Sequence, residues 1–206
     1  MPQVKVKICG ITRADDALAA ARLGADALGF NFWPRSKRYL PPSEARAIVR
    51  RLPSFVTAVG VFVDPTREDV LRAVEQAGIG VAQLHGDEPP ALCAALPIPV
   101  LKGIRLDGPR SLAQLASYEV QAFLLDAPSA GYGGSGSTCD WSLAAEIARE
   151  LPVVLAGGLT PENVSDAVRA VGPWAVDVAS GVESAPGVKD PERMRLFLER
   201  AKEATR

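Results

Sequence analysis

Two side chains have the chemistry to move protons on a small ligand: the thiol of Cys9 and the carboxyl group of Asp126. Cys9 ends the apolar run 4–9, and Asp126 directly follows the apolar run 122–125. A thiolate beside a cation acts as a base or a nucleophile, and a carboxylic acid acts as a proton donor. Each residue also has a structural alternative. A free cysteine packs as a small apolar side chain, and an aspartate caps helices or orders loops.

Glycines follow two of the other apolar runs, in segments 156–159 and 179–183. Gly157 and Gly158 lie in the first segment, and Ser180 and Gly181 lie in the second. Glycines let a ligand approach the backbone, whose N–H groups bind anions without the help of a lysine. Glycines also serve tight turns, but two such loops after neighbouring strands predict a phosphate site.

Further candidates for ligand binding are a basic loop, a histidine and a glycine-rich segment. Arg38, in the aromatic and basic loop 31–39, can hold a carboxylate through paired hydrogen bonds, while a solvated basic loop is the alternative. We expect His85 to have a positioning role and not a catalytic one. Gly134 and Ser135 belong either to a flexible surface loop or to a lid that contacts a polar ligand.

Lys7 shares one face of its apolar run with Cys9, because successive side chains of a strand alternate between its two faces. The other face carries Val6 and Ile8 and should meet the helices, which turns Lys7 inward. An unpaired ammonium group is costly in the interior. We therefore expect an ion pair with Asp177 and a bias of Cys9 toward its thiolate form.

Eight short apolar runs must position these residues: 4–9, 27–32, 56–63, 81–84, 100–104, 122–125, 153–156 and 175–179. Most are continuously apolar, as strands buried on both faces of a parallel sheet are, and amphipathic segments separate them. Eight strand–helix units predict that residues 1–206 form one α/β domain, a (β/α)8 TIM barrel. A doubly wound open sheet is the alternative, although its GxGxxG fingerprint does not follow the first run.

The predicted helices carry start and stop signals of their own. Thr12 is expected to cap the first helix, and segment 64–66 opens a helix that stops at Gly78. A further helix is predicted at 111–116. In a barrel of this kind, functional residues lie at the carboxyl ends of the strands and in the loops that follow them, where the candidates for chemistry and ligand binding stand.

Composition excludes several other classes of function. The 206 residues are 48% hydrophobic and 23% charged with a formal charge of −1 and no long basic run, so nucleic acid is not an expected partner. No apolar run reaches the ~20 residues of a membrane span, and the N-terminus lacks the apolar core of a secretory signal. A cytoplasmic location without membrane contact is therefore predicted. Three cysteines without a CxxC pair and a single histidine predict neither a metal site nor a disulfide framework.

In order and spacing, these motifs resemble those of the phosphoribosylanthranilate isomerases of tryptophan biosynthesis over essentially the whole chain. The matching segments are KICGIT at 7–12, Ser36 with Arg38, QLHG at 83–86, Asp126, GGSG at 133–136, DW at 140–141, AGGL at 156–159 and DVASGVE at 177–183. Lys37 and Cys139 depart from the family pattern, which commonly has proline and an aromatic residue there. Neither position is assigned to chemistry.

The resemblance implies an intramolecular oxidoreductase, an aldose–ketose isomerase that needs no metal or organic cofactor. Its Amadori rearrangement converts N-(5-phosphoribosyl)anthranilate into 1-(2-carboxyphenylamino)-1-deoxyribulose 5-phosphate, the third step from chorismate. The resemblance makes Asp126 the general acid, Cys9 the general base and Arg38 the ligand of the anthranilate carboxylate. It places the phosphate on the loops that hold Gly157, Gly158, Ser180 and Gly181. The expected partner is the phosphoribosyl substrate, bound by a monomer or a homodimer.

Two other interpretations stay open. Another phosphosugar isomerase could use the same fold, such as the bifunctional enzyme that also handles a histidine-pathway aminoaldose. Such enzymes resemble one another in having aspartate where Cys9 stands. A phosphate-binding barrel without catalysis needs neither an acid nor a base, so the presence of both Cys9 and Asp126 favours an enzyme.

Overall fold

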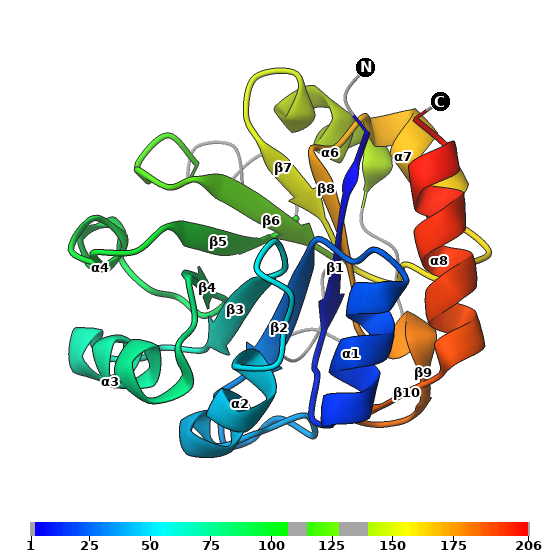
Figure 1. Ribbon diagram of the computed structural model, residues 1–206. Helices are drawn as coiled ribbons and strands as arrows, with labels where there is room; N and C mark the ends of the chain where they lie inside the picture. Colours follow the sequence, from blue (N-terminus) through cyan, green and yellow to red (C-terminus); the bar gives the residue numbers. More distant parts are fainter. Residues whose placement is uncertain (1–2, 107–114, 128–139, 206) are drawn as a thin grey trace.

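The computed structural model describes residues 3–106, 115–127 and 140–205. Within them, eight parallel strands close into a barrel in chain order, with helices around it (Figure 1). The strands are β1 (Lys5–Cys9), β2 (Ala27–Asn31), β3 (Thr57–Phe62), β4 (Val81–Leu84), β5 (Val100–Arg105), β6 (Ala122–Asp126), β7 (Val153–Leu155) and β8 (Ala175–Val178). β1 pairs with both β2 and β8, which closes the sheet. The predicted (β/α)8 barrel is thereby confirmed.

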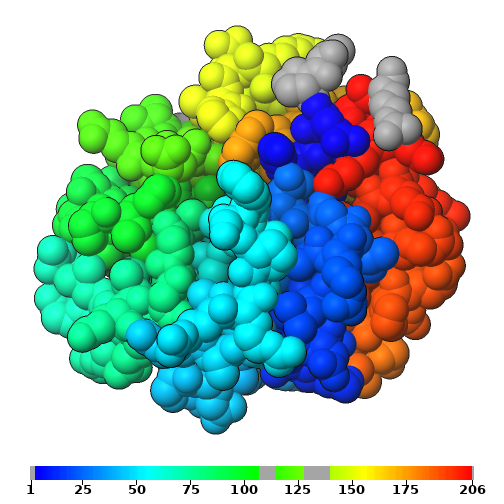
Figure 2. All heavy atoms as spheres, in the orientation of Figure 1, coloured from blue at the N-terminus to red at the C-terminus, as the bar shows by residue number. Residues whose placement is uncertain are grey.

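The helices form the outer layer of the molecule. They are α1 (Ala14–Arg22), α2 (Pro42–Val49), α3 (Arg67–Ala77), α4 (Pro90–Ala94), α6 (Trp141–Ala148), α7 (Val164–Val171) and α8 (Pro191–Glu203). The space-filling view shows the blue α1 between α2 and the red α8, so the last helix closes the ring beside the first (Figure 2). Most of the predicted helix at 111–116 lies outside the described residues. None of the helices listed above is long and apolar enough to cross a membrane.

The apolar core has two layers, one on each side of the strands. Val6 and Ile8 of β1 belong to the larger cluster, which includes the buried faces of the helices. A smaller cluster lies on the other side of the strands and consists of Val59, Leu101, Ala122, Leu124, Val154, Ala156 and Ala175. Lys7 and Cys9 are buried on the face of β1 opposite to Val6 and Ile8, as the alternation predicted.

Local signals explain where several helices begin and end. The side chain of Thr66 accepts a hydrogen bond from the Asp69 backbone N–H and forms a reciprocal capping box at the start of α3. Gly78 ends this helix with φ of 77°, a left-handed conformation that favours glycine. The prediction that Thr12 caps α1 is wrong. Its hydroxyl instead donates to the carbonyl oxygen of Gly187, because the segment that follows β8 lies next to this position.

A short hairpin follows β8 and was not predicted. The chain makes one turn of 3-10 helix, η1 (Ser180–Val182), and then the antiparallel strands β9 (Glu183–Ala185) and β10 (Val188–Lys189). Strands of three and two residues are too short to show an alternating pattern. The hairpin brings two charged side chains, those of Glu183 and Lys189, to the carboxyl ends of the barrel strands.

Candidate functional site

The carboxyl ends of the strands surround one cavity of about 630 Å³. This volume lies within the range of small-molecule sites, about 300–1,000 Å³. The predicted residues that line it are Cys9, Arg38, His85, Asp126, Gly157, Gly158, Asp177, Ser180 and Gly181. Gly134 and Ser135 lie outside the described residues. The barrel therefore brings together candidates that are up to 172 positions apart in the chain, from Cys9 to Gly181.

Cys9 lies at the end of β1 in a polar corner of the cavity, and it is 8% exposed. Burial raises the pKa of the Cys9 thiol, and the Lys7 ammonium opposes that rise. Lys7 Nζ lies 2.8 Å from Asp177 Oδ1, which is the ion pair expected from the sequence. Burial lowers the pKa of Lys7, but Asp177 and Cys9 outweigh burial and raise the pKa above its ordinary value.

The backbone of β2 passes directly beside the thiol. A Cβ atom at Gly29 would lie 2.7 Å from the Cys9 Sγ, closer than any ordinary contact. Gly29 is paired with Cys9 in the parallel register of the two strands. Glycine at this position therefore leaves the sulfur room to face the cavity.

Asp126 ends β6, and two other strands, β7 and β8, separate it from Cys9 in the barrel. Its Oδ1 accepts a hydrogen bond from the Ala127 backbone N–H at 2.9 Å. Its Oδ2 lies 3.2 Å from His85 Nε2, and His85 Nδ1 lies 3.0 Å from Gln83 Nε2. The carboxyl group thus faces the cavity with both oxygens oriented. His85 therefore contacts the candidate acid, and its positioning role stays a prediction.

The two loops predicted to bind phosphate form one wall of the cavity. Gly157 and Gly158 follow β7 with φ of 82° and 62°, and Ser180 and Gly181 form the turn after β8. A Cβ atom at Gly181 would collide with the carbonyl oxygen of Leu159. Close packing of the two loops therefore depends on glycine, and it brings two backbone segments to the same wall of the cavity.

Arg38 is held by a partner that sequence reasoning missed. Its Nε and Nη2 donate to the two carboxylate oxygens of Glu183 at 2.8 and 2.7 Å. Lys189 Nζ also donates to Glu183, at 2.9 Å. Burial alone would raise the pKa of Glu183, but the hydrogen bonds from Arg38 and Lys189 hold that pKa below its usual value. Glu183 thus fixes two nitrogens of the Arg38 guanidinium group, Nε and Nη2.

No signal in the sequence identified Glu183 as the partner of Arg38. Glu183 stands inside the matching segment 177–183, but 145 positions separate it from Arg38. Their contact requires the hairpin, which has no periodic pattern. Gln83 was likewise part of a motif without a role of its own, and only the structure gives it a contact with His85.

Fold and cavity together define the class of the protein. It is a (β/α)8-barrel with a thiol, a carboxyl group, an arginine and two glycine loops around a single mouth at the carboxyl ends of its strands. Residues 6–200 match the family model of N-(5'phosphoribosyl)anthranilate (PRA) isomerase. The chain belongs to this family, so the resemblance seen in the sequence is confirmed.

Individual relatives cover nearly the whole chain. The N-(5'-phosphoribosyl)anthranilate isomerase of Myxococcus xanthus (strain DK1622) is 48% identical over 204 residues, which are 97% of this chain and 96% of the relative. The crystal structure of phosphoribosyl anthranilate isomerase from Thermotoga maritima has a TM-score of 0.92 at 45% identity and covers 97% of this chain and 99% of its own.

Two further structures of such isomerases show a bound ligand in one case and concern the oligomeric state in the other. One contains reduced 1-(o-carboxyphenylamino)-1-deoxyribulose 5-phosphate, and it has a TM-score of 0.87 at 41% identity. The other shows monomers generated from the dimeric enzyme of Thermotoga maritima, with a TM-score of 0.88 at 41% identity. Each covers 97% of this chain and 99% of its own.

Proposed function

We propose that the protein converts N-(5-phosphoribosyl)anthranilate into 1-(2-carboxyphenylamino)-1-deoxyribulose 5-phosphate, with Asp126 as general acid and Cys9 as general base. One observation carries this assignment: in a member of this isomerase family, both groups line one cavity together with Arg38 and the two glycine loops. A ligand with a carboxylate at one end and a phosphate at the other fits such a cavity.

The first step opens the sugar ring. Asp126 gives its proton to the ring oxygen, the bond from that oxygen to C1 breaks, and the lone pair of the amine nitrogen forms a Schiff base. The Asp126 carboxylate that results is stabilised by the Ala127 backbone N–H at 2.9 Å and by the His85 ring at 3.2 Å. Donors that are already in place add to this stabilisation without reorganisation.

The second step removes the proton from C2. The Cys9 thiolate takes this proton, and the electron pair of the C–H bond moves toward the iminium carbon to give an enolamine, which tautomerises to the ketone. Because burial raises the pKa of the thiol, the thiolate needs a nearby cation. The Lys7 ammonium supplies this charge, while Asp177 holds Lys7 in position.

Purified protein should turn over freshly made phosphoribosylanthranilate in the presence of a chelator. The loss of anthranilate-type fluorescence measures this turnover. Binding of a phosphorylated product analogue without any turnover would contradict the proposed activity and favour a phosphate-binding barrel. Turnover of a histidine-pathway aminoaldose at a similar kcat/KM would instead favour the bifunctional phosphosugar isomerase.

Arg38→Met should raise KM about 10- to 100-fold, because a charged hydrogen-bonded contact with the substrate carboxylate is worth roughly 1.5–3 kcal/mol. The value of kcat should change much less, since the carboxylate is bound equally in the ground and transition states. Initial rates over a range of substrate concentrations separate the two constants.

Arg51→Met is the matched control, because it removes the same charge from an exposed position that does not line the cavity. Its KM should stay within about twofold of the wild-type value. Equal effects of the two substitutions would show a general electrostatic effect of one lost positive charge and contradict a specific contact with Arg38.

We also propose that residues 1–206 form a single domain and that the protein acts in the cytoplasm. A further proposal concerns assembly: the protein forms a homodimer through the end of the barrel at which the strands begin. Phe55 is 99% exposed and Trp174 is 53% exposed, and both lie just before strands, β3 and β8. They therefore stand at the opposite end from the cavity. A relative of known structure is described as dimeric, which supports a second copy as the occupant of this apolar surface.

Replacing Phe55 and Trp174 together by serine should convert a dimer into a monomer, because the substitutions remove the two large exposed rings of this surface. Sedimentation equilibrium measures the mass, and kcat should stay within about twofold because the cavity lies at the other end. Tyr39→Ser is the control for an exposed ring at the cavity end. A monomeric wild type, or a dimer that survives the double substitution, would rule out this interface.

A further inference from the structure

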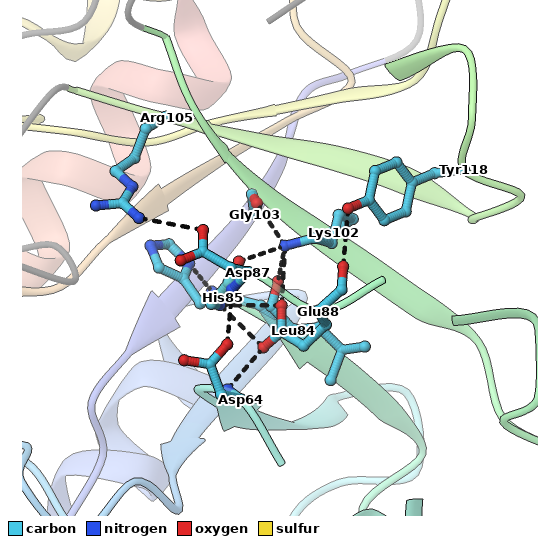
Figure 3. A network of polar contacts seen from close by, with 11 residues as sticks. Asp64, Leu84, His85, Asp87, Glu88, Lys102, Gly103, Arg105 and Tyr118 are labelled. Carbon is cyan, nitrogen blue, oxygen red and sulfur yellow. Dashed lines mark hydrogen bonds and ion pairs between the residues drawn. The ribbon is translucent and has the colours of Figure 1, made fainter. Parts of the chain in front are cut away.

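A buried ion pair lies beneath the loop that carries His85, and it does not line the cavity. The side chains of Lys102, on β5, and of Glu88, after β4, are 2% and 1% exposed. Lys102 Nζ donates to Glu88 Oε2 at 2.9 Å and to the carbonyl oxygens of Gly86 and Gly103 at 2.8 and 3.0 Å. Figure 3 shows these bonds converging on the single nitrogen of Lys102.

The Glu88 carboxylate binds the same turn from the other side. It accepts hydrogen bonds from the backbone N–H of Gly86 at 2.9 Å and of Asp64 at 3.0 Å. Asp64 in turn accepts the N–H of Asp87 at 2.7 Å, and Tyr118 donates its hydroxyl to the Glu88 carbonyl oxygen at 2.8 Å (Figure 3). The loops after β3, β4 and β5 are thereby joined at one point.

This pair is not explained by stability alone. Removing two charges from water is costly, and a well-packed apolar pair of similar volume is often as stable as a buried ion pair or more so. The main consequence of the Lys102–Glu88 pair is the geometry that it imposes. It fixes both the N–H and the carbonyl group of Gly86, the residue that follows His85.

His85 is therefore held through both its backbone and its ring. Its backbone N–H donates to the Phe62 carbonyl oxygen at 2.9 Å. Its ring lies against Gly103, where a Cβ atom would be 2.7 Å from Nδ1. The carbonyl group of that same Gly103 accepts a hydrogen bond from Lys102. The ion pair thus sets both the turn that carries the imidazole and the backbone on which the imidazole rests.

Gln83 selects the tautomer of the ring. Because its amide nitrogen donates to Nδ1 at 3.0 Å, a neutral ring carries its proton on Nε2 and donates it to Asp126 Oδ2 at 3.2 Å. Gln83 Oε1 is buried without a partner among the described residues. If the amide turned around, Oε1 would require a proton on Nδ1, and Nε2 would no longer donate to Asp126.

We propose that the Lys102–Glu88 ion pair is a positioning element for the general acid: it fixes the turn of His85 so that the ring donates from Nε2 to Asp126. The role rests on the proposed function of Asp126. Lys102 and Glu88 act through His85 and do not touch the substrate. Loss of this positioning should therefore slow the ring-opening step and leave binding of the phosphate and the carboxylate almost unchanged.

Histidine labelled with ¹⁵N gives a direct test, because His85 is the single histidine of the chain. The wild-type spectrum should show one imidazole with a proton on Nε2 and an unprotonated Nδ1. Glu88→Gln keeps the shape of the side chain and removes its charge. Gly103→Ala displaces the ring directly and leaves the ion pair in place. Both variants should show a second tautomer or a broadened signal.

The same variants should lower kcat about 10- to 100-fold, a range typical of small displacements in a catalytic site, with KM within about twofold. Asp87→Asn is the matched control in the same turn. It breaks an exposed ion pair with Arg105, 3.5 Å long, in which the Asp87 side chain is 80% exposed. Both the ring spectrum and kcat of this control should equal those of the wild type.

Folded variants with a wild-type His85 spectrum, or with an altered spectrum and a wild-type kcat, would overturn the positioning role. If Glu88→Gln does not fold, Gly103→Ala decides between these outcomes. A fully active Asp126→Asn variant would overturn the proposed function, and with it this role. The Glu88 and Gly103 variants test the ion pair separately, because Asp126 is intact in both.

Discussion

Cys9→Ser and Asp126→Asn are each expected to lower kcat at least ~10²-fold, the usual contribution of a positioned general base or acid. Serine lacks the acidity needed to form a base at Cys9, and asparagine has no carboxyl proton for the sugar ring oxygen. Because each variant interrupts a different step, neither group can replace the other. Fluorescence loss with phosphoribosylanthranilate measures the rates, and circular dichroism checks that each variant is folded.

Two other residues supply controls for this comparison. Cys93 is buried in α4 away from the cavity, and Asp166 is exposed near the start of α7. Cys93→Ser and Asp166→Asn make the same chemical changes and should leave kcat within about threefold of the wild-type value. Activity that survives in Cys9→Ser or in Asp126→Asn would remove that residue from the proposed mechanism.

Lys7→Met is expected to lower the free energy of unfolding by about 3 to 5 kcal/mol, the usual effect of removing one partner of a buried ion pair. The Lys7 and Asp177 side chains are only 4% and 10% exposed, so Asp177 would be left as a nearly buried, unpaired carboxylate. Urea unfolding measures the loss. A Lys7→Met variant as stable as the wild type would show that water already reaches Asp177.

The same substitution should move the pH dependence of kcat/KM. Burial raises the pKa of Cys9, and the charges of Lys7 and Lys189 lower it, so the loss of Lys7 leaves Lys189 as the weaker opposing charge and raises the pKa further. Less thiolate is then present at a given pH, and the limb of the profile that rises with thiol ionisation should shift to higher pH. An unshifted limb would contradict the electrostatic role of Lys7.

Lys5→Met is the control on the same strand. Lys5 lies 3.1 Å from Asp26, but its side chain is 55% exposed. An ion pair of this kind contributes at most about 1 kcal/mol, so Lys5→Met should change stability little and should not shift the pH profile. Comparison of the two lysines separates the buried charge from the general effect of one lost cation.

The barrel itself was accessible from the sequence because each strand is a compact apolar run. Parallel strands in a closed sheet place all their carboxyl ends at one mouth, which is why Cys9 and Asp126 could be assigned to one site without coordinates. The alternation along β1 likewise predicted that Lys7 points inward to Asp177. These inferences need only the period of a strand and the topology of the fold.

The remaining features depend on contacts between distant loops, which leave no periodic signal. Arg38 meets Glu183 through a hairpin of very short strands. Thr12 has the type and spacing of a helix cap, but its hydroxyl binds Gly187 instead. Lys102 stands in an apolar run, and its ammonium group donates to Glu88 and to the backbone carbonyl oxygens of Leu84, Gly86 and Gly103. In each case, tertiary structure and not a local sequence pattern determined the contact.

The glycines beside Cys9 and His85 also affect how this protein can be altered. Gly29 and Gly103 have no side chains with which to contact a ligand, yet a Cβ atom at Gly29 would lie 2.7 Å from the Cys9 Sγ and one at Gly103 would lie 2.7 Å from His85 Nδ1. A mutant library aimed at a new substrate varies the residues around the ligand. Glycines next to these residues would normally be included among the positions that tolerate substitution. In this barrel, redesign of the pocket is therefore limited by two backbone positions, one beside the thiol and one beside the imidazole, that leave no room for a side chain.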